Sequence, residues 1–340
     1  MESPVVNVFA DLPIDPAALS MEQPGGSPFL MHLHHLGEPF HAWLSNRGAF
    51  EGLVRESWRD VSRWWGFYVK CDWNRFDHHA RKYWRDDWPT NPTALDRHDA
   101  IHRALEVTFA PVMVKRGFVA WKLALVAPRP DTNWKAAAAF AGAWADDDVA
   151  KAQAELFGVL DQFVQQRWNW YPGLVVGLYE ELGVGFDPSW RITRDDFRDL
   201  RDLFAVTFER SHQYLPALMS LDNSFRLGDP NLYPDRTVRT RSSMQTMRSV
   251  DREKVIGLYE CWGPEIVGIL DRHLRNAIAH STADHDLITG RIVAPKLDLT
   301  YPEFVAKVAN AIQVPLLLLE VFKYVRILQE SRVESNRQGD

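Results

Sequence analysis

Three residues near the C-terminus, Arg275, Asn276 and His280, have the types and spacing that phosphodiester chemistry requires. They belong to the hexapeptide Arg-Asn-Ala-Ile-Ala-His, in which small or apolar residues separate the polar ones. A guanidinium binds phosphate oxygens through paired hydrogen bonds, and an imidazole exchanges protons near neutral pH. At about 100° per residue of helix, Asn276 and His280 lie about 40° apart. The hexapeptide therefore predicts a helix that offers an Arg–His pair to a phosphodiester.

The Arg-x4-His spacing alone carries little information. A chain with 29 Arg and 12 His matches it about once by chance, and this chain matches it twice, at Arg275 to His280 and at Arg97 to His102. Requiring an asparagine after the arginine, with 11 Asn in the chain, lowers the chance expectation to roughly 0.03. The first match has that asparagine. We interpret the second match, which has no comparable context, as coincidental.

The pattern around the hexapeptide predicts a small helical bundle. A capping-box pattern beginning at Thr193 opens an amphipathic helix. Pro264 opens another helix, which is expected to carry the hexapeptide in its second half. Residues 286–300 alternate like a hairpin that turns at Thr289-Gly290. A second capping box at Thr300 begins a long apolar helix with an expected kink at Pro315.

These features resemble the HEPN superfamily, whose ribonuclease members carry an Arg, a polar residue that is often Asn, a few spacers and a His. Arg275, Asn276 and His280 match that pattern residue by residue, and the resemblance covers roughly residues 190–335. The resemblance implies a C-terminal HEPN-like helical bundle with a small β-hairpin. It also implies a metal-independent endoribonuclease without a cofactor, acting as a toxin or anti-phage defence effector. An antitoxin or other regulatory partner belongs to that expectation.

The implied mechanism assigns a role to each residue. The 2′-hydroxyl attacks the neighbouring phosphate, His280 transfers protons, Arg275 stabilises the charged phosphoryl oxygens, and Asn276 orients His280 or the phosphate. One histidine cannot act as base and acid in the same instant, so two copies of the motif across a twofold axis predict a homodimer. DNA lacks the 2′-hydroxyl and is not an expected substrate.

A polar segment at residues 228–249 supplies weaker candidates for binding the RNA backbone. Arg236, Arg239 and Arg241 lie within it, and Arg272 lies beside the hexapeptide. Long loops inside compact domains are usually functional or disordered, so a solvated flexible loop is the alternative. After this segment, Asp251 is expected to cap a helix that runs to Trp262.

Clusters of Pro and Gly mark the predicted boundaries in the chain. They predict an arm at 1–28, a mostly helical Trp-rich domain at 29–187, the bundle at 188–335 and a tail at 336–340. The predicted fold class is therefore mainly α. Ten of the 14 Trp lie before residue 150. They indicate aromatic core packing, with a base-stacking platform as the alternative. The segment Trp170-Tyr171-Pro172-Gly173 is expected to be a turn.

The overall composition limits which partners and which cellular compartment we expect. The net charge of −6 excludes a uniformly basic nucleic-acid binder, so RNA contact requires a local basic patch. Two cysteines without a CxxC pattern favour a reducing compartment. The first residues do not resemble a signal peptide, and apolar runs such as Val314 to Leu319 are too short to span a bilayer. We expect a cytoplasmic protein that does not engage a membrane.

Several alternatives remain open at this level. The motif can serve a non-catalytic HEPN-fold module that binds a nucleotide or a protein. A metal-dependent phosphohydrolase would use imidazole and carboxylate ligands, with candidates at His32, His34, His35, Asp77, His78, His79, His98 and Asp99. A non-enzymatic helical interaction protein is a further alternative. The Trp-rich half can also restrain or trigger a nuclease in the other half.

Overall fold

A computed structural model describes residues 12–13, 28–113, 133–192, 194–280, 282–294 and 297–337. The first half contains α2 Pro28–Leu36, α3 Glu38–Val69, α4 Trp73–Trp84, α5 Ala94–Phe109, α7 Trp134–Gly142, α8 Asp146–Gln165 and α9 Arg167–Glu181. The second half contains α10 Phe197–Leu227, α11 Arg241–Thr246, α12 Ser249–Ile256, α13 Gly263–Ile269, α14 Arg272–Ala279, β1 Asp284–Asp286, β2 Arg291–Ala294, β3 Leu297–Thr300, α15 Tyr301–Ala311 and α16 Gln313–Arg337. The predicted class, mainly helical with a small antiparallel sheet, is confirmed.

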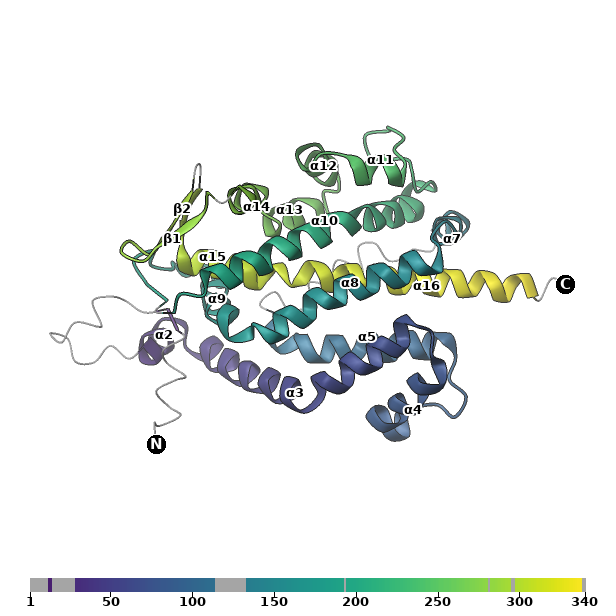
Figure 1. The fold of residues 1–340 in the computed structure, drawn as a ribbon, viewed down its shortest axis with the longest axis horizontal. Helices are drawn as coiled ribbons and strands as arrows, with labels where there is room; N and C mark the ends of the chain where they lie inside the picture. The colour runs from purple at the N-terminus through teal and green to yellow at the C-terminus, as the bar shows by residue number, and fades with distance from the viewer. Residues whose placement is uncertain are drawn as a thin grey trace.

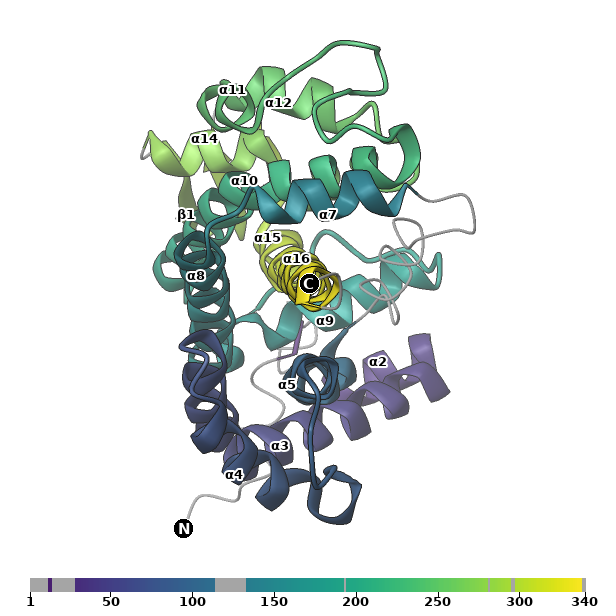
Figure 2. The ribbon, with the colours of Figure 1, turned by 90° about the vertical axis from the view of Figure 1, so that its right-hand side faces the viewer.

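Helices α15 and α16 form the central axis of the molecule. Viewed end-on, α16 is surrounded by α5, α7, α8, α9 and α10 (Figure 2), and α11, α12 and α14 lie in a layer outside α10. The stretch Tyr301–Ser331 is long and apolar enough to cross a membrane by length and composition alone, but 83% of its most apolar window is buried by the other helices. Packing in the bundle therefore accounts for the apolar sequence.

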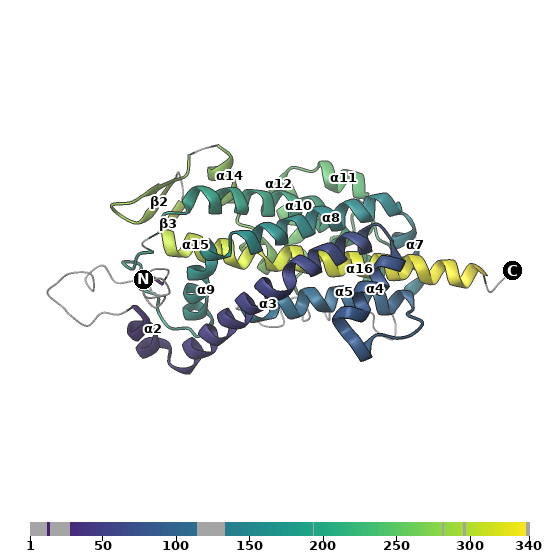
Figure 3. The ribbon, with the colours of Figure 1, turned by 60° about the horizontal axis from the view of Figure 1, so that its bottom comes forward.

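The Trp-rich region builds an aromatic core around α3. This helix runs from α2 toward α4 beside α5 (Figures 1 and 3). Trp58 and Trp65 both stack on Phe157 from α8, with ring centroids 5.3 and 5.0 Å from that of Phe157. The buried Trp side chains before residue 150 are Trp43, Trp58, Trp64, Trp65, Trp88 and Trp144. Core packing is thus confirmed for these rings, since they belong to the hydrophobic core cluster.

The expected turn at residues 170–173 is wrong, because these residues lie inside α9. Trp170 and Tyr171 are fully buried, and α9 crosses α15 so closely that a Cβ atom at Gly173 would collide with the Val305 carbonyl. Glycine is required here by the approach of two backbones and not by a turn. Tertiary packing overrides the local Pro-Gly signal, and it keeps Pro172 within the helix.

Three further helix boundaries differ from the prediction. The helix expected from Asp251 to Trp262 runs only from Ser249 to Ile256, with Asp251 in its first turn. The helix expected after Pro264 is divided into α13 and α14, because Asp271 caps a new helix with its side chain. The kink expected at Pro315 is a break at Ile312, and Pro315 lies in the first turn of α16, where its missing N–H costs little.

The predicted hairpin is extended by a third strand. β1 pairs antiparallel with β2 and β2 with β3, in the order β1-β2-β3. Gly290 has φ +63° in the turn between the first two strands, a conformation that favours glycine, and this confirms the turn position. The capping box at Thr300 is also confirmed, since Glu303 and Thr300 bond each other's backbone N–H groups. Thr193 lies outside the described residues, and α10 begins at Phe197.

One hydrophobic core runs across the predicted domain boundary at residue 188. Buried side chains of α8 and α9 join the same cluster as those of α10, α15 and α16. The α9–α15 crossing and the α8–α16 contact both link the two halves. The division into two domains stays a prediction, but the Trp-rich half and the C-terminal half support each other in the folded chain. Most of the predicted arm at 1–28 lies outside the described residues.

Candidate functional site

The motif lies on α14, an eight-residue helix fixed at its beginning by Asp271. The Asp271 carboxylate accepts hydrogen bonds from the backbone N–H groups of His273 and Leu274 at 2.9 and 3.1 Å. It also pairs with Lys307 of α15 at 3.1 Å. Burial raises the pKa of Asp271, but these bonds outweigh burial and keep it below its ordinary value. The start of α14 is therefore tied to the central axis by a charged cap.

Side chains of α14 separate into an inner and an outer face. Leu274, Ala277 and Ile278 are buried against the bundle. Arg275 and Asn276 are half-buried on the outer side, and His280 is exposed. Leu274, Ala277 and Ile278 thus anchor the helix, while its polar residues remain near solvent.

Arg275 is held by a carboxylate from another helix. Its Nε and Nη2 atoms both donate to one oxygen of Glu209 on α10, with the Nε–Oε1 distance at 2.7 Å. Its Nη1 atom donates to the Asn276 side-chain oxygen at 3.3 Å, and its guanidinium lies 5.7 Å from the Phe208 ring centroid. Arg275 and Glu209 keep 30% and 54% of their side-chain surface exposed. A phosphate can therefore compete for this guanidinium.

His280 is the C-terminal cap of α14. Its backbone N–H bonds the Asn276 carbonyl at 3.0 Å, which ends the helix. Within the described part of the chain, no hydrogen bond or ion pair engages its exposed ring. The imidazole is therefore available to a ligand, on the same short helix as Arg275 and Asn276.

The weaker basic candidates are mostly neutralised by carboxylates. Arg239 pairs with Asp235 at 2.6 Å, Arg241 pairs with Asp148 at 3.4 Å, and Arg272 pairs with Glu253 at 2.7 Å. Arg241 also lies 3.4 Å from the Trp144 ring centroid. Arg236 is exposed and has a positive φ of 64°. The segment 228–249 contains a β-bridge and the short α11, so it has more structure than the loop that we expected.

The segment with Arg239 and Arg241 lies away from the motif. Figure 1 shows α11 over one end of α10 and α14 toward the other, with α12 between them. Arg275 and Asn276 are in contact and His280 ends the same helix, but the structure does not place the arginines of the 236–241 segment beside them.

The second Arg-x4-His match belongs to a buried polar network. His102 is 2% exposed and its Nδ1 lies 2.6 Å from Glu320 of α16. His98 lies 2.7 Å from the Tyr68 hydroxyl and 2.8 Å from Glu330. These contacts join α3, α5 and α16, so His98 and His102 serve the core of the bundle. In the described residues, no group of three or more His, Cys, Asp or Glu side chains is placed to hold a metal ion.

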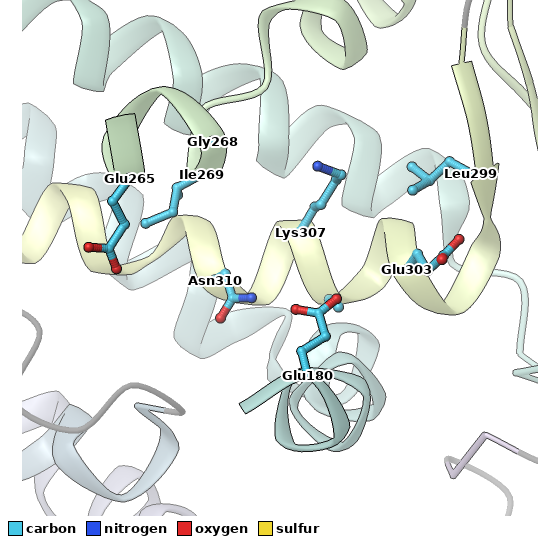
Figure 4. A pocket seen from close by; sticks show the side chains of 9 residues that line it. Glu180, Glu265, Gly268, Ile269, Leu299, Glu303, Lys307 and Asn310 are labelled. Atoms are coloured by element: carbon cyan, nitrogen blue, oxygen red, sulfur yellow. The ribbon is translucent and has the colours of Figure 1, made fainter. Parts of the chain in front are cut away.

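A cavity of about 350 Å³ lies close to the motif helix, between α9, α13 and α15 (Figure 4). Three carboxylates, Glu180, Glu265 and Glu303, line it together with a single cation, Lys307, which is already paired with Asp271. Glu303 is also engaged in the capping box of α15. The excess of negative charge disfavours a phosphate in this cavity.

A groove of about 910 Å³ lies along α10 and reaches the motif through Glu209. Its lining residues from α10 and the α11–α12 segment include Glu209, Arg210, His212, Gln213, Gln245 and Arg252. Glu209 belongs to both sites, because it also binds Arg275. Sequence analysis did not find this groove. No motif spacing connects α10 with α14, since Glu209 and Arg275 are 66 residues apart.

Comparisons with protein-family models, with curated proteins and with solved structures found no match for this chain. The resemblance to the HEPN superfamily therefore stays a prediction from the motif and its setting.

Proposed function

We propose that this protein is a metal-independent endoribonuclease of the HEPN type, with Arg275, Asn276 and His280 as its catalytic residues. The observation that carries the proposal is the state of α14. Two of its spacers, Ala277 and Ile278, are buried, and His280 is exposed. Arg275 contacts Asn276 and pairs with one partly exposed carboxylate, Glu209. A guanidinium, an amide and an imidazole are then presented together to one phosphodiester.

The chemistry follows from these three groups. His280 accepts the proton of the 2′-hydroxyl as its oxygen attacks phosphorus, and Arg275 stabilises the charge that develops on the phosphoryl oxygens. The 5′-oxygen leaves and takes a proton from an acid, which gives a 2′,3′-cyclic phosphate and a 5′-hydroxyl. A second His280, from the partner in a homodimer, supplies that acid. A role as a toxin or anti-phage effector is part of the proposal and rests on family analogy alone.

The primary test is cleavage of a labelled structured RNA by the full chain in EDTA. We expect wild-type protein to leave 2′,3′-cyclic ends, and His280→Ala and Arg275→Ala to lower the rate by about 10²-fold or more. His273→Ala, an exposed histidine on the same helix, and Arg198→Ala, an exposed arginine on α10, are the matched controls and should retain the rate. Cleavage that survives both motif substitutions would show that the site is elsewhere.

Mixing subunits tests the composite site. If each reaction uses one His280 from each protomer, a ninefold excess of His280→Ala chain leaves roughly one tenth of wild-type chains with a wild-type partner. The rate per wild-type chain should then fall about tenfold after exchange of subunits. An unchanged rate would exclude the shared site.

A non-catalytic binding module is the second candidate. The observation that favours it is the Glu209 contact, which already occupies the guanidinium that catalysis needs. Binding of RNA without cleavage, weakened by Arg275→Ala but not by His280→Ala, would support this function over the nuclease.

A further inference from the structure

The groove beside the motif is continuous with it through one side chain. Glu209 lines the groove and binds Arg275. Gln245 and Arg252 approach from the α11–α12 segment, which lies in the same outer layer as α14 (Figure 2). A strand of nucleic acid that reaches Arg275 can therefore extend along α10 into this groove.

Most charges in the groove are already balanced by neighbours. Arg210 pairs with Glu155 at 3.0 Å. Of the two carboxylates that line the groove, Asp202 pairs with Arg201 at 3.0 Å and Glu209 pairs with Arg275. The groove charge that remains is the guanidinium of Arg252, which has no carboxylate within ion-pair distance among the residues that the structure describes.

Arg252 is an unusual buried cation. Its side chain is 7% exposed and is held by backbone carbonyls, at 2.6 Å from His212, 2.8 Å from Gln245 and 3.0 Å from Met247. These bonds use three of the five N–H donors of a guanidinium. Its Nε atom has no hydrogen-bond partner in the described part of the protein. Burial lowers the pKa of Arg252, and the negative charge of Glu209 offsets this lowering only in part. An anion would stabilise this group.

His212 adds a second unsatisfied group at the same place. It is 5% exposed, stacks on Phe208 at 4.1 Å between ring centroids, and has no partner for Nδ1 within the described residues. Burial, and then the charges of Arg252 and Arg275, lower the pKa of His212 to about 3. The ring is therefore neutral at physiological pH, and a neutral imidazole still offers one N–H donor.

We propose that this groove is a phosphate subsite, in which Arg252 and His212 hold a backbone phosphate of the RNA strand next to the nucleotide cut at α14. The inference rests on the proposed ribonuclease function and extends it. Two observations favour a phosphate within a strand over a free phosphate. The groove shares Glu209 with the motif, and its volume of about 910 Å³ with an open side accommodates a continuing chain.

The first test observes His212 in the folded wild-type protein. The full chain is labelled with 13C in its histidine rings, and His212→Gln identifies the His212 signal. A 2′-O-methyl RNA oligonucleotide, which lacks the attacking hydroxyl, is then added, and inorganic phosphate is added in a separate titration. We expect both ligands to shift the His212 signal and to raise its pKa, because a nearby negative charge favours the imidazolium.

The second test uses matched substitutions of two buried arginines. Arg252→Gln should raise the KM for RNA about tenfold with little change in kcat, and should lower the slope of log affinity against log salt by about 0.7, the value for one contact to single-stranded RNA. The control is Arg326→Gln. Arg326 is also 7% exposed, but it bonds Gln153 and Cys71 in the core away from this groove.

The outcomes separate the two proposals. RNA that stays intact while the oligonucleotide shifts His212 would support the phosphate subsite and overturn the nuclease. RNA cleavage with an unmoved His212 signal and a wild-type KM for Arg252→Gln would overturn the subsite and leave the nuclease standing. A shift with inorganic phosphate but none with the oligonucleotide would identify a pocket for a small phosphorylated molecule and would also overturn the strand subsite.

Discussion

The two Arg-x4-His matches of this chain lie in opposite environments. On α5, Arg97 makes a bidentate pair with Asp77 at 2.9 and 2.8 Å, and His102 is buried against Glu320. On α14, Arg275 has a partly exposed carboxylate partner and His280 faces solvent. On α5 the two residues of the match link this helix to α4 and α16, and we call them the structural brace. On α14 the same spacing gives a candidate reaction site.

This difference shows which property of a motif carries chemistry. On α5, the half-buried Arg97 and the buried His102 each pair with a carboxylate, so their contacts are with the protein and not with a ligand. The pair on α14 keeps its donors within reach of solvent, since the three apolar residues of the helix do the anchoring. Solvent exposure and ion-pair partners distinguish the two Arg-x4-His sites, whereas the spacing of the Arg and His does not.

The largest expected effect is on stability. His102→Ala removes the donor to Glu320 and leaves a cavity, so the free energy of unfolding should fall by about 2–4 kcal/mol. His280→Ala should stay within about 0.5 kcal/mol of wild type, because an exposed ring is removed. Urea denaturation at pH 7 measures both. Equal losses for the two variants would contradict the contrast between a brace and a reaction site.

The second effect is a dependence of stability on pH. Burial lowers the pKa of His102, and desolvation of Glu320 is outweighed by His102 and Lys323, so the pKa of Glu320 falls to about 2. For both groups the folded pKa is below the unfolded one. The His102 contribution is therefore lost as pH falls below about 6.5, and the Glu320 contribution as it falls below about 4.5.

Between pH 7 and pH 5, the free energy of unfolding of the wild type should decline, because His102 takes up a proton more readily in the unfolded chain than in the folded one. His102→Gln keeps an N–H donor for Glu320 but cannot titrate, so its stability should decline less steeply than that of wild type over this interval. His280→Gln is the control and should follow the wild-type slope, because its ring is exposed. Unfolding in urea at several pH values measures the slopes, and parallel curves for wild type and His102→Gln would refute the assignment.

Local sequence patterns predicted helix starts and turns better than they predicted the contacts between helices. The capping box at Thr300 and the turn at Gly290 could be recognised because each depends on neighbouring residues. The start of α14 was missed although its cap, Asp271, is as local as Thr300, because the apolar periodicity continues across the break and was interpreted as one helix. The helical course of Pro172 could not be predicted, since the α9–α15 contact decides it.

The candidate site was predictable only in part for the same reason. Arg275, Asn276 and His280 are close in sequence, and their shared helix follows from the pattern. Glu209, His212 and Arg252 come from other elements, and no spacing relates them to the motif. Long-range packing therefore supplies the partner of Arg275 and the groove beside it. Such contacts set whether the motif is free to bind a phosphate.

The smallest expected effect concerns Glu209, the carboxylate partner of Arg275. Glu209→Gln removes the charge that competes with phosphate for Arg275 but preserves the shape of the side chain. A partly exposed ion pair is worth about 0–1 kcal/mol, so the KM for RNA should fall by at most about fivefold while kcat stays the same. Steady-state cleavage at 0.15 M salt, where charges beyond about 8 Å are screened, measures this change.

Asp235→Asn is the matched control, because it also removes one negative charge and releases an arginine, Arg239, in the segment beyond α10. If both variants lower KM equally, net charge explains the effect and Glu209 has no special relation to the motif. If Glu209→Gln lowers kcat instead, the carboxylate orients Arg275 for the transition state and is a positioning residue. A change in KM confined to Glu209→Gln would mean that RNA must displace this carboxylate from Arg275. Arg275 would then differ from Arg97 on α5 because its carboxylate partner gives way to a ligand.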